Sequence, residues 1–314
     1  MENLDLLENQ LKSISYRHMG RLCIAHINAQ SLNDSEHFAE FEHIFCKSAF
    51  DIVAVSETFY KDTSRINIPN YNCFYVNRKN INGGGVCVYV AERFNVKVLA
   101  TSDGEPLKPE FIILDVNCGT NNVLFTCVYR PPKVGCMDIL VEQLFNYLPQ
   151  YAYAVMCGDS NARFGSGSFE TTNVEECLEM CNLTSIPYGP TYHTHQCDTT
   201  LDVLATNMDD LVIEFGQTVA PGFSNHDLIY AVVDLKVSSP AKKYMYFRNF
   251  NKIHLEQLAS DADLIIWDEV YNSPSIEDKV KCFNSKIMEL MNKHAPIRTV
   301  LVKTSSAPWM TGDG

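Results

Sequence analysis

Short apolar runs recur along the first three quarters of the chain, and they predict a domain rich in β-structure. Nine such runs are dominated by β-branched and aromatic residues and lie at 22–28, 51–57, 85–90, 111–116, 123–129, 153–159, 201–206, 211–216 and 228–235. Runs of this length and composition are typical of strands. Polar links as short as VNCGTNN (116–122) favour antiparallel hairpins over helical crossovers between some of them.

Helical periodicity occurs between these strands and then replaces them. Apolar residues repeat at helical spacing in 35–48, 137–148 and 173–181. The mixture predicts an α/β domain over residues 21–238, with a partly antiparallel pair of sheets flanked by helices, after an N-terminal extension of residues 1–20. Beyond residue 238 the strand signals stop. Two stretches, 254–271 and 275–295, predict a helical tail over 239–314, and Ser275 is the expected N-cap of the second.

Composition and charge narrow the class of protein. With 314 residues, 46% hydrophobic and 20% charged, the chain is globular rather than disordered, collagenous or coiled-coil. The net charge is -13, and residues 1–238 hold 15 Lys and Arg against 29 Asp and Glu. This balance excludes a passive phosphate-neutralising surface, but it suits an enzyme that meets phosphate through a divalent cation. No apolar run approaches the roughly 18 residues of a membrane span, and the N-terminus lacks a signal region, so we expect an intracellular protein.

The twelve cysteines lie mostly inside apolar runs and include no CxxC pair, which is typical of reduced core thiols. An alternative is a zinc site formed by Cys177, Cys181, His193, His195 and Cys197. Their spacings fit no paired-knuckle pattern, so the core interpretation is favoured.

Polar residues follow several of the apolar strands at their C-terminal ends, where sites commonly assemble at one rim of a sheet. They are Asn28, Glu57, Tyr129, and Asp159 with Asn161, and Asp202 and His226 join them from later segments. Taken singly, each has an ordinary explanation as a turn cap, a rim residue or a solvated acid.

Taken together, these residues indicate metal-assisted hydrolysis of a phosphodiester. Glu57 offers Mg²⁺ a hard oxygen ligand. Asp159 and Asn161 lie two apart on an expected extended segment, so they point to one side and hold a water and a phosphate oxygen. His226 donates to the scissile phosphate, and Asp202 fixes the tautomer of His226.

The ordered motifs resemble those of a known superfamily. They are HINAQSL (26–32), SET (56–58), VYRPP (128–132), GDSN (158–161), PTY (190–192), LDVLATN (201–207) and SNHD (224–227). Over residues 20–237 the chain resembles the endonuclease/exonuclease/phosphatase superfamily. Within that superfamily it is similar to the apurinic-type endonuclease domain of non-LTR retrotransposons, particularly the insect jockey-like group. The stretch APWMT (307–311) resembles the segment that joins this endonuclease to a reverse transcriptase.

The resemblance implies a DNase I-like, four-layered sandwich of two mixed β-sheets flanked by helices. It implies a Mg²⁺-dependent endonuclease, with Mn²⁺ as an alternative ion, that nicks DNA and leaves a 3′-hydroxyl. DNA is then the partner, no membrane is involved, and the nucleus is the expected location even though KKYMYFR (242–248) holds too few basic residues for an import signal. Carried over by position, the roles are metal binding by Glu57 and Asn28, catalysis by Asp159, His226, Tyr129, Asn161 and Asp202, and substrate binding by Arg130, Thr191 and Asn225. For Arg130 the alternative is an exposed surface residue.

Three departures from the family pattern bear on activity. Asn225 stands where the family usually has Asp, and an amide lacks the negative charge that would help hold a metal or a charged imidazole. Ser160 replaces the commoner Phe and is expected to alter only packing. No reverse transcriptase follows, so coupled nicking and copying is not expected of this chain alone. The alternatives are therefore a weakened or inactive remnant that only binds nucleic acid or protein, and, less favoured, an inositol or sphingolipid phosphodiesterase.

Overall fold

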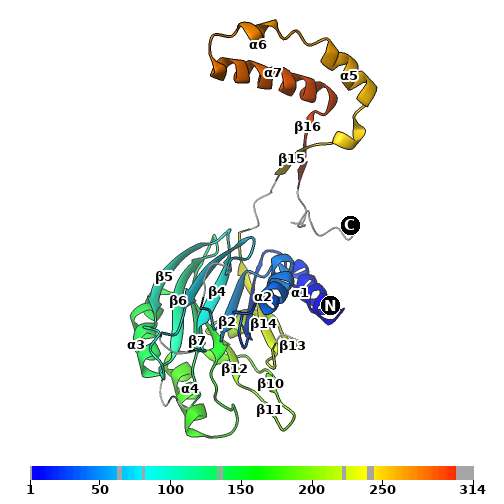
Figure 1. Cartoon of the computed structure of the whole chain (residues 1–314). Helices are drawn as coiled ribbons and strands as arrows, with labels where there is room; N and C mark the ends of the chain where they lie inside the picture. The colour runs from blue at the N-terminus through cyan, green and yellow to red at the C-terminus, as the bar shows by residue number, and fades with distance from the viewer. Residues whose placement is uncertain are drawn as a thin grey trace. The chain divides into compact units, whose positions relative to one another are not determined.

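The structure is a computed structural model that describes residues 2–61, 66–79, 82–132, 134, 137–220, 224–238 and 244–301. It divides into two compact units, Met1–Pro240 and Ala241–Gly314, and each is described by itself (Figure 1). Cys136 and the stretch 307–311 lie outside the described residues. Among the described residues, no helix is long and apolar enough to cross a membrane.

The larger unit contains two six-stranded mixed sheets. The first has the order β13-β14-β1-β2-β4-β3, and the second has the order β5-β6-β7-β8-β12-β9. The strands of the first sheet are β1 (Arg21–Asn28), β2 (Ile52–Ser56), β3 (Tyr71–Val76), β4 (Val86–Ala91), β13 (Val212–Thr218) and β14 (Leu228–Lys236). Those of the second are β5 (Asn95–Thr101), β6 (Glu110–Asn117), β7 (Asn122–Tyr129), β8 (Tyr153–Asp159), β9 (Thr184–Ser185) and β12 (Asp202–Thr206). Each sheet has one parallel pair, β1 with β2 and β7 with β8, and its other pairs are antiparallel.

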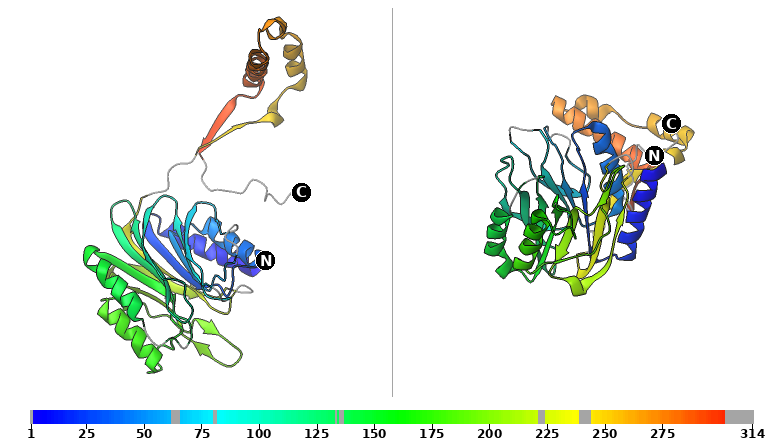
Figure 2. Two further views of the ribbon diagram at one scale, coloured as in Figure 1. Left: turned by 60° about the vertical axis from the view of Figure 1, so that its left-hand side comes forward. Right: turned by 90° about the horizontal axis from the view of Figure 1, so that it is seen from below.

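Helices cover the two outer faces, as the views in Figures 1 and 2 show. Helices α1 (Glu2–Arg17) and α2 (Ser35–Ser48) pack on the first sheet, and α3 (Asp138–Tyr147) and α4 (Phe169–Met180) pack on the second. Short elements complete the unit: the 3-10 turns η1 (Leu148–Gln150) and η2 (Asp209–Leu211), and a small hairpin of β10 (Tyr192–His193) and β11 (Asp198–Thr199). The predicted four-layered, DNase I-like sandwich is therefore confirmed.

Alternation along the strands divides the core into three layers. On β1, Leu22 and Ile24 face the second sheet, whereas Cys23 and Ala25 face α1 and α2. Successive side chains of a strand point to opposite faces, so each central strand contributes to an inner and an outer core. Burial of apolar surface in these three cores is the main source of stability of the sandwich.

Most predicted elements of the larger unit are confirmed to within two residues, but five strands were missed: β3, β5 and the two-residue strands β9, β10 and β11. β3 and β5 are each an edge strand of their sheet, and their residues are largely exposed or half-buried. An edge strand with a solvated face lacks the continuous apolar run that marks a central strand. The helix expected at 173–181 begins earlier, because Ser168 caps it by accepting the N–H of Thr171. The extension of residues 1–20 is mostly helix α1, which packs on α2 and buries Leu7 and Leu11.

The described cysteines are free thiols and most are buried, which confirms the core interpretation. Cys177 and Cys181 belong to the outer core beneath α4, whereas Cys197 is exposed next to the β10–β11 hairpin. Among the described residues, no group of potential metal ligands includes them.

The smaller unit is not purely helical, so the prediction of a helical tail is corrected. An antiparallel pair of strands, β15 (Tyr244–Arg248) and β16 (Ile297–Leu301), joins its two ends. Between them lie η3 (Phe250–Lys252), α5 (Leu255–Asp263), α6 (Asp268–Asn272) and α7 (Ile276–His294). The helix expected over 254–271 is interrupted between α5 and α6, and Trp267 at this interruption stacks on Phe283 of α7, with ring centroids 5.4 Å apart. Ser275 caps α7 as predicted, accepting the N–H of Asp278 at 3.0 Å.

One glycine tests the close approach of β7 and β8. A Cβ on Gly158 would stand 1.7 Å from the carbonyl oxygen of Val128, the residue it faces across the parallel pair. We predict that Gly158→Ala lowers the free energy of unfolding by more than about 2 kcal/mol, because the two strands must separate. Gly165→Ala is the control: Gly165 has φ +80 but no neighbouring atom within 4 Å, so only backbone strain of roughly 1–2 kcal/mol applies. Equal losses in urea denaturation of the two variants would contradict the close-approach argument.

Candidate active site

The strand register brings the predicted residues to one rim of the sandwich. In the second sheet, Asp159 at the end of β8 is level with Tyr129 at the end of β7 and with Asp202 at the start of β12. In the first sheet, Asn28 at the end of β1 is level with Ser56 at the end of β2, and Glu57 follows directly. On β7 and β8 the residues two positions before Tyr129 and Asp159 are Cys127 and Cys157, which pack in the inner apolar layer. Polar groups thus replace apolar ones where the inner layer reaches the rim.

Two of these residues have a left-handed backbone. Glu57 has φ +54, and the chain leaves the line of β2 at this point. Asn161 has φ +46, so the segment after β8 is a turn and not the extended segment that we predicted. The turn is closed by the N–H of Asn161, which donates to Oδ1 of Asp159 at 2.8 Å. The two side chains still come together, since Nδ2 of Asn161 lies 3.2 Å from Oδ2 of Asp159.

Asp159 is the centre of the site and is 1% exposed. Besides the two contacts from Asn161, its Oδ2 accepts a hydrogen bond from Nδ2 of Asn28 at 2.8 Å, which joins the two sheets. Burial raises the pKa of Asp159 to about 7, with a further contribution from the charge of Asp202, while His226 and the N–H of Asn161 act in the opposite direction. A carboxylate with a pKa near neutrality is well suited to accept a proton from water.

His226 and Asp202 form a buried pair on the other side of Asp159. Nδ1 of His226 and Oδ2 of Asp202 are 2.7 Å apart, and both residues are almost fully buried. Burial alone would lower the pKa of His226, but the Asp202 carboxylate, aided by Asp159 and Glu57, raises it to about 9. The imidazole is therefore protonated at neutral pH. The ring of Tyr192, which we did not single out, packs against His226 with centroids 4.7 Å apart.

Tyr129 lies between Glu57, the predicted metal ligand, and the ion pair of Arg78 with Glu110. Its hydroxyl donates to Oε1 of Glu57 at 2.8 Å, and burial together with the charge of Glu57 raises its pKa, so it keeps its proton. The guanidinium of Arg78 lies 5.8 Å from the centre of the Tyr129 ring and forms an ion pair with buried Glu110. Arg78 and Glu110 were not among the site residues predicted from the sequence. The signal was the GGG at 83–85, since a Cβ on Gly84 would meet the Arg78 guanidinium and the N–H of Gly85 donates to Glu110.

Arg130 and Thr191, which were predicted to bind substrate, are both buried. Arg130 is 1% exposed, so the alternative of an exposed surface residue is wrong, and its guanidinium donates to the carbonyl oxygens of Val134 and, at 3.3 Å, Asn161. Thr191 is fully buried, and its hydroxyl accepts the N–H groups of Leu201 and Asp202, each at 3.1 Å. In this conformation both side chains organise the loops that carry Asn161 and Asp202.

Asn225 and Ser160 have different surroundings. Asn225 is exposed beside His226 and uses its backbone, donating to Oε1 of Gln30 at 2.9 Å and accepting from His193 at 3.0 Å. Ser160 does more than alter packing, because its hydroxyl donates to the carbonyl oxygen of Leu201 at 2.8 Å. That bond ties the end of β8 to the start of β12.

The donor set at this rim fits a divalent cation. Carboxylate oxygens of Asp159 and Asp202 lie within 4.8 Å of each other, and the third member of this cluster, His226, is protonated and so is not a ligand. Glu57 adds a half-buried carboxylate. Carboxylate oxygens are the ligands that Mg²⁺ and Mn²⁺ prefer. Asn28 already directs Nδ2 to Asp159 and Oδ1 to the N–H of Gln30, so its amide orients Asp159 in this structure.

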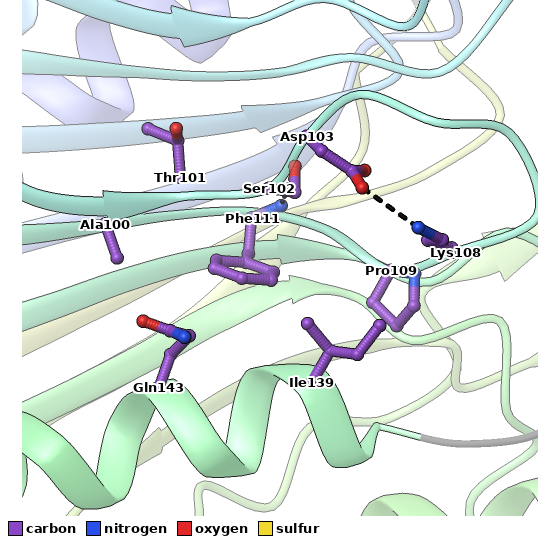
Figure 3. A pocket seen from close by; sticks show the side chains of 9 residues that line it. All are labelled: Ala100, Thr101, Ser102, Asp103, Lys108, Pro109, Phe111, Ile139 and Gln143. Atoms are coloured by element: carbon purple, nitrogen blue, oxygen red, sulfur yellow. Dashed lines mark hydrogen bonds and ion pairs between the residues drawn. The ribbon is translucent and has the colours of Figure 1, made fainter.

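A cavity elsewhere on the sandwich holds none of these residues. Figure 3 shows this cavity of about 280 Å³, which is formed by the loop between β5 and β6 together with residues of α3. Its one cation, Lys108, is 2.9 Å from the carboxylate of Asp103, and the remaining lining is neutral. Its chemistry is unrelated to that of the rim.

Comparison with known proteins shows which proteins have a similar sequence and fold. Residues 123–230 match the family model described as endonuclease-reverse transcriptase. The matched segment contains Tyr129, Asp159, Asn161, Asp202 and His226. The larger unit has the fold of the endonuclease/exonuclease/phosphatase superfamily, and the predicted resemblance is confirmed at this level. No curated protein sequence matches the chain.

Three solved structures illustrate the similarity. The endonuclease domain of TRAS1, a telomere-specific non-LTR retrotransposon, is 14% identical with a TM-score of 0.55, covering 68% of this chain and 99% of that one. The 3′ phosphatase NExo from Neisseria, bound to a product DNA hairpin, is 15% identical with a TM-score of 0.55, covering 68% and 100%. Truncated TDP2 of Caenorhabditis elegans is 14% identical with a TM-score of 0.52, covering 68% and 98%. At these identities the likeness shows the fold.

The pKa of His226 predicts how stability depends on pH. Because the folded pKa of about 9 exceeds the ordinary 6.5, the His226–Asp202 pair stabilises the protein fully below pH 6.5, and this contribution is lost as pH rises through 9. In chelator, the free energy of unfolding should fall by about 2 kcal/mol between pH 7 and 9. Urea denaturation of His226→Gln should show no such decrease, whereas the exposed control His195→Gln should retain it. A slope that survives in His226→Gln would refute the assignment.

Proposed function

We propose that this protein is a divalent-cation-dependent endonuclease that nicks DNA and leaves a 3′-hydroxyl. The observation that carries the proposal is the buried Asp159 carboxylate, held by two amide side chains and facing the His226–Asp202 pair at the rim of this fold. Phosphodiester hydrolysis needs a proton acceptor for the attacking water and a positively charged donor for the phosphate, and a base of near-neutral pKa beside a protonated imidazole supplies both.

Asp159 activates the attacking water in this proposal. Its carboxylate accepts one proton as the water oxygen bonds to phosphorus, and the bond between phosphorus and O3′ breaks. The leaving O3′ takes up a proton from solvent water and becomes the 3′-hydroxyl, while the phosphate stays on the 5′ carbon of the following nucleotide. Asn28 and Asn161 keep the Asp159 carboxylate in one orientation during this step.

His226 and Asn161 bind the phosphate. The protonated imidazole directs Nε2–H away from Asp202 and toward a non-bridging oxygen, where negative charge accumulates in the transition state. The amide of Asn161, whose Nδ2 lies 3.0 Å from the carbonyl oxygen of Arg130 and 3.2 Å from Oδ2 of Asp159, is a second, neutral donor once phosphate replaces one of these two acceptors. Asp202 keeps the imidazole in one orientation and stabilises its charge.

Glu57 and Tyr129 prepare the cation side of the site. Glu57, with the carboxylate of Asp159 nearby, would hold Mg²⁺ or Mn²⁺, and the bound cation would supply Lewis-acid stabilisation of phosphate charge. Tyr129 keeps its proton and hydrogen-bonds Glu57, which fixes the rotamer of that carboxylate.

The comparisons support DNA as the substrate class. The matched family is described by an endonuclease and a reverse transcriptase, and the similar structures include a retrotransposon endonuclease and an enzyme bound to a DNA hairpin. We infer an origin in a retrotransposon reading frame and action on nuclear DNA. Residues 21–238 form the nuclease in this proposal, and residues 239–314 correspond to the segment that connects such a nuclease to a polymerase. A binding-only remnant is the alternative, favoured by the amide at Asn225.

Plasmid nicking tests the proposal directly. Purified full-length protein should convert supercoiled plasmid to open circle with Mg²⁺, and chelator should stop the conversion. Asp159→Asn should lower the rate roughly 100-fold or more, because general-base assistance is lost at nearly constant volume. The exposed control Ser166→Ala should cut like the wild type. Extension of the nick by a DNA polymerase without prior phosphatase treatment should report a 3′-hydroxyl.

One outcome would count against the assignment, and one control is needed to interpret the assay. Nicking that persists in Asp159→Asn would place the base elsewhere. Thermal unfolding must accompany the assay, because Asp159 is buried and a misfolded variant would also be inactive.

Asn225→Asp tests whether the missing charge limits the reaction. Asn225 is exposed, so the substitution adds a charge beside His226 without a packing cost. We expect the Mg²⁺ concentration for half-maximal nicking to fall severalfold, since a nearby anion attracts the cation. Gln150→Glu adds the same charge on η1 and should change nothing. Nicking by Asn225→Asp but not by the wild type would identify a silenced remnant.

A further inference from the structure

His26 interrupts the apolar pattern of the inner core. On β1, Leu22 and Ile24 face the second sheet, and alternation places His26 next on the same face, one layer below Asn28. Its neighbours in register are Ala54 on β2 and Ile229 on β14, which are both fully buried apolar residues. His26 is 0% exposed. A polar ring at such a position is costly unless it is hydrogen-bonded.

The two ring nitrogens of His26 face different partners. Nε2 lies 3.2 Å from Oγ of Ser56, at the end of β2. Nδ1 lies 3.6 Å from Oδ1 of Asp202, on the opposite sheet, and these two atoms are both buried without another hydrogen-bond partner. A separation of 3.6 Å is slightly longer than a hydrogen bond, and a shift of roughly 0.5 Å would close it.

The hydrogen-bonding partners of His26 select one tautomer of its ring. If Nε2 carried the proton, the bare Nδ1 would face a carboxylate oxygen, and two buried acceptors would oppose each other. If Ser56 donates to Nε2 instead, Nδ1 carries the proton and points at Asp202. Only the second arrangement satisfies both orphaned atoms.

We propose that His26 is a positioning residue that donates from Nδ1 to Asp202 and so holds the carboxylate from the side opposite His226. The inference rests on the proposed function and deepens it. Asp202 then lies between two imidazoles, with Oδ2 on His226 and Oδ1 on His26. With both oxygens engaged, and the backbone N–H of Asp202 bonded to Thr191, the carboxylate has one orientation, and so has His226.

The test uses substitutions that preserve one ring nitrogen each. In His26→Asn the amide nitrogen takes the place of Nδ1, so a donor to Asp202 remains. In His26→Gln the amide oxygen takes the place of Nε2, so the contact with Ser56 remains but the donor to Asp202 is lost. His26→Leu removes both. A role limited to filling space would favour Gln, whose volume is closer to that of histidine.

We expect nicking by His26→Asn to stay close to the wild type, whereas His26→Gln and His26→Leu should lose roughly tenfold in kcat with KM unchanged. A loss of this size is typical when a residue that orients a catalytic group through a hydrogen bond is removed. Ser56→Ala, a small change that leaves His26 in place, should lose part of the same activity. His43→Asn on α2 is the matched control and should cut like the wild type. Nicking by Gln equal to that of the wild type, or by Asn as poor as that of Leu, would overturn the proposal.

A spectroscopic measurement separates this inference from the function itself. The Nδ1 proton of His226, bonded to Asp202, gives a low-field proton resonance in chelated protein, without any need for cutting. The resonance should keep its position in His26→Asn and move in His26→Gln and His26→Leu. An unchanged resonance in the Gln and Leu variants overturns the role of His26. If the wild type fails to nick while the resonance moves as expected, the proposed function fails and the positioning role stands.

Discussion

The structure of the rim depends on the burial of one carboxylate between two sheets. Asp159 is almost inaccessible to water, and an isolated charge there would be strongly unfavourable. Its oxygens are therefore met by Nδ2 of Asn28 from the opposite sheet and by the turn at Asn161. Because these donors come from different sheets, the site exists only when the sandwich is closed. The same burial raises the pKa of Asp159 toward neutrality, which links the cost of folding around a carboxylate to its use as a base.

The remaining polar groups extend this network along the rim. Asp202, level with Asp159 on the neighbouring strand, holds His226, and Tyr129, level with Asp159 on the other side, holds Glu57. Further ties come from residues that touch no reacting atom, such as Thr191 on the Asp202 backbone and Arg130 on the Asn161 carbonyl. A site of this kind is preorganised by its supports, and this is where most of the unexpected residues lie.

The elements themselves were largely predictable. Central strands such as β1 and β8 carry continuous apolar runs because both of their faces are buried, and helix α2 has a clear period and a capping Asp34. Edge strands β3 and β5 were missed because one face is solvated, and the pairing of β15 with β16 was missed because its partners are far apart in sequence. Local patterns carry no information about contacts made only after long loops close.

The sequence by itself determined the types of residue at the rim and their order, because strand length and alternation place Asn28, Tyr129 and Asp159 at strand ends on the inner face. Only the tertiary structure decided which partners they have. Arg130 and Thr191, which were predicted to bind substrate, are buried and hydrogen-bond the backbone next to the site. His26, Arg78 and Glu110 are additional members of the polar network at the rim. The physical reason is that hydrogen bonds and pKa values depend on distances and burial across two sheets, and these are fixed by packing rather than by local sequence.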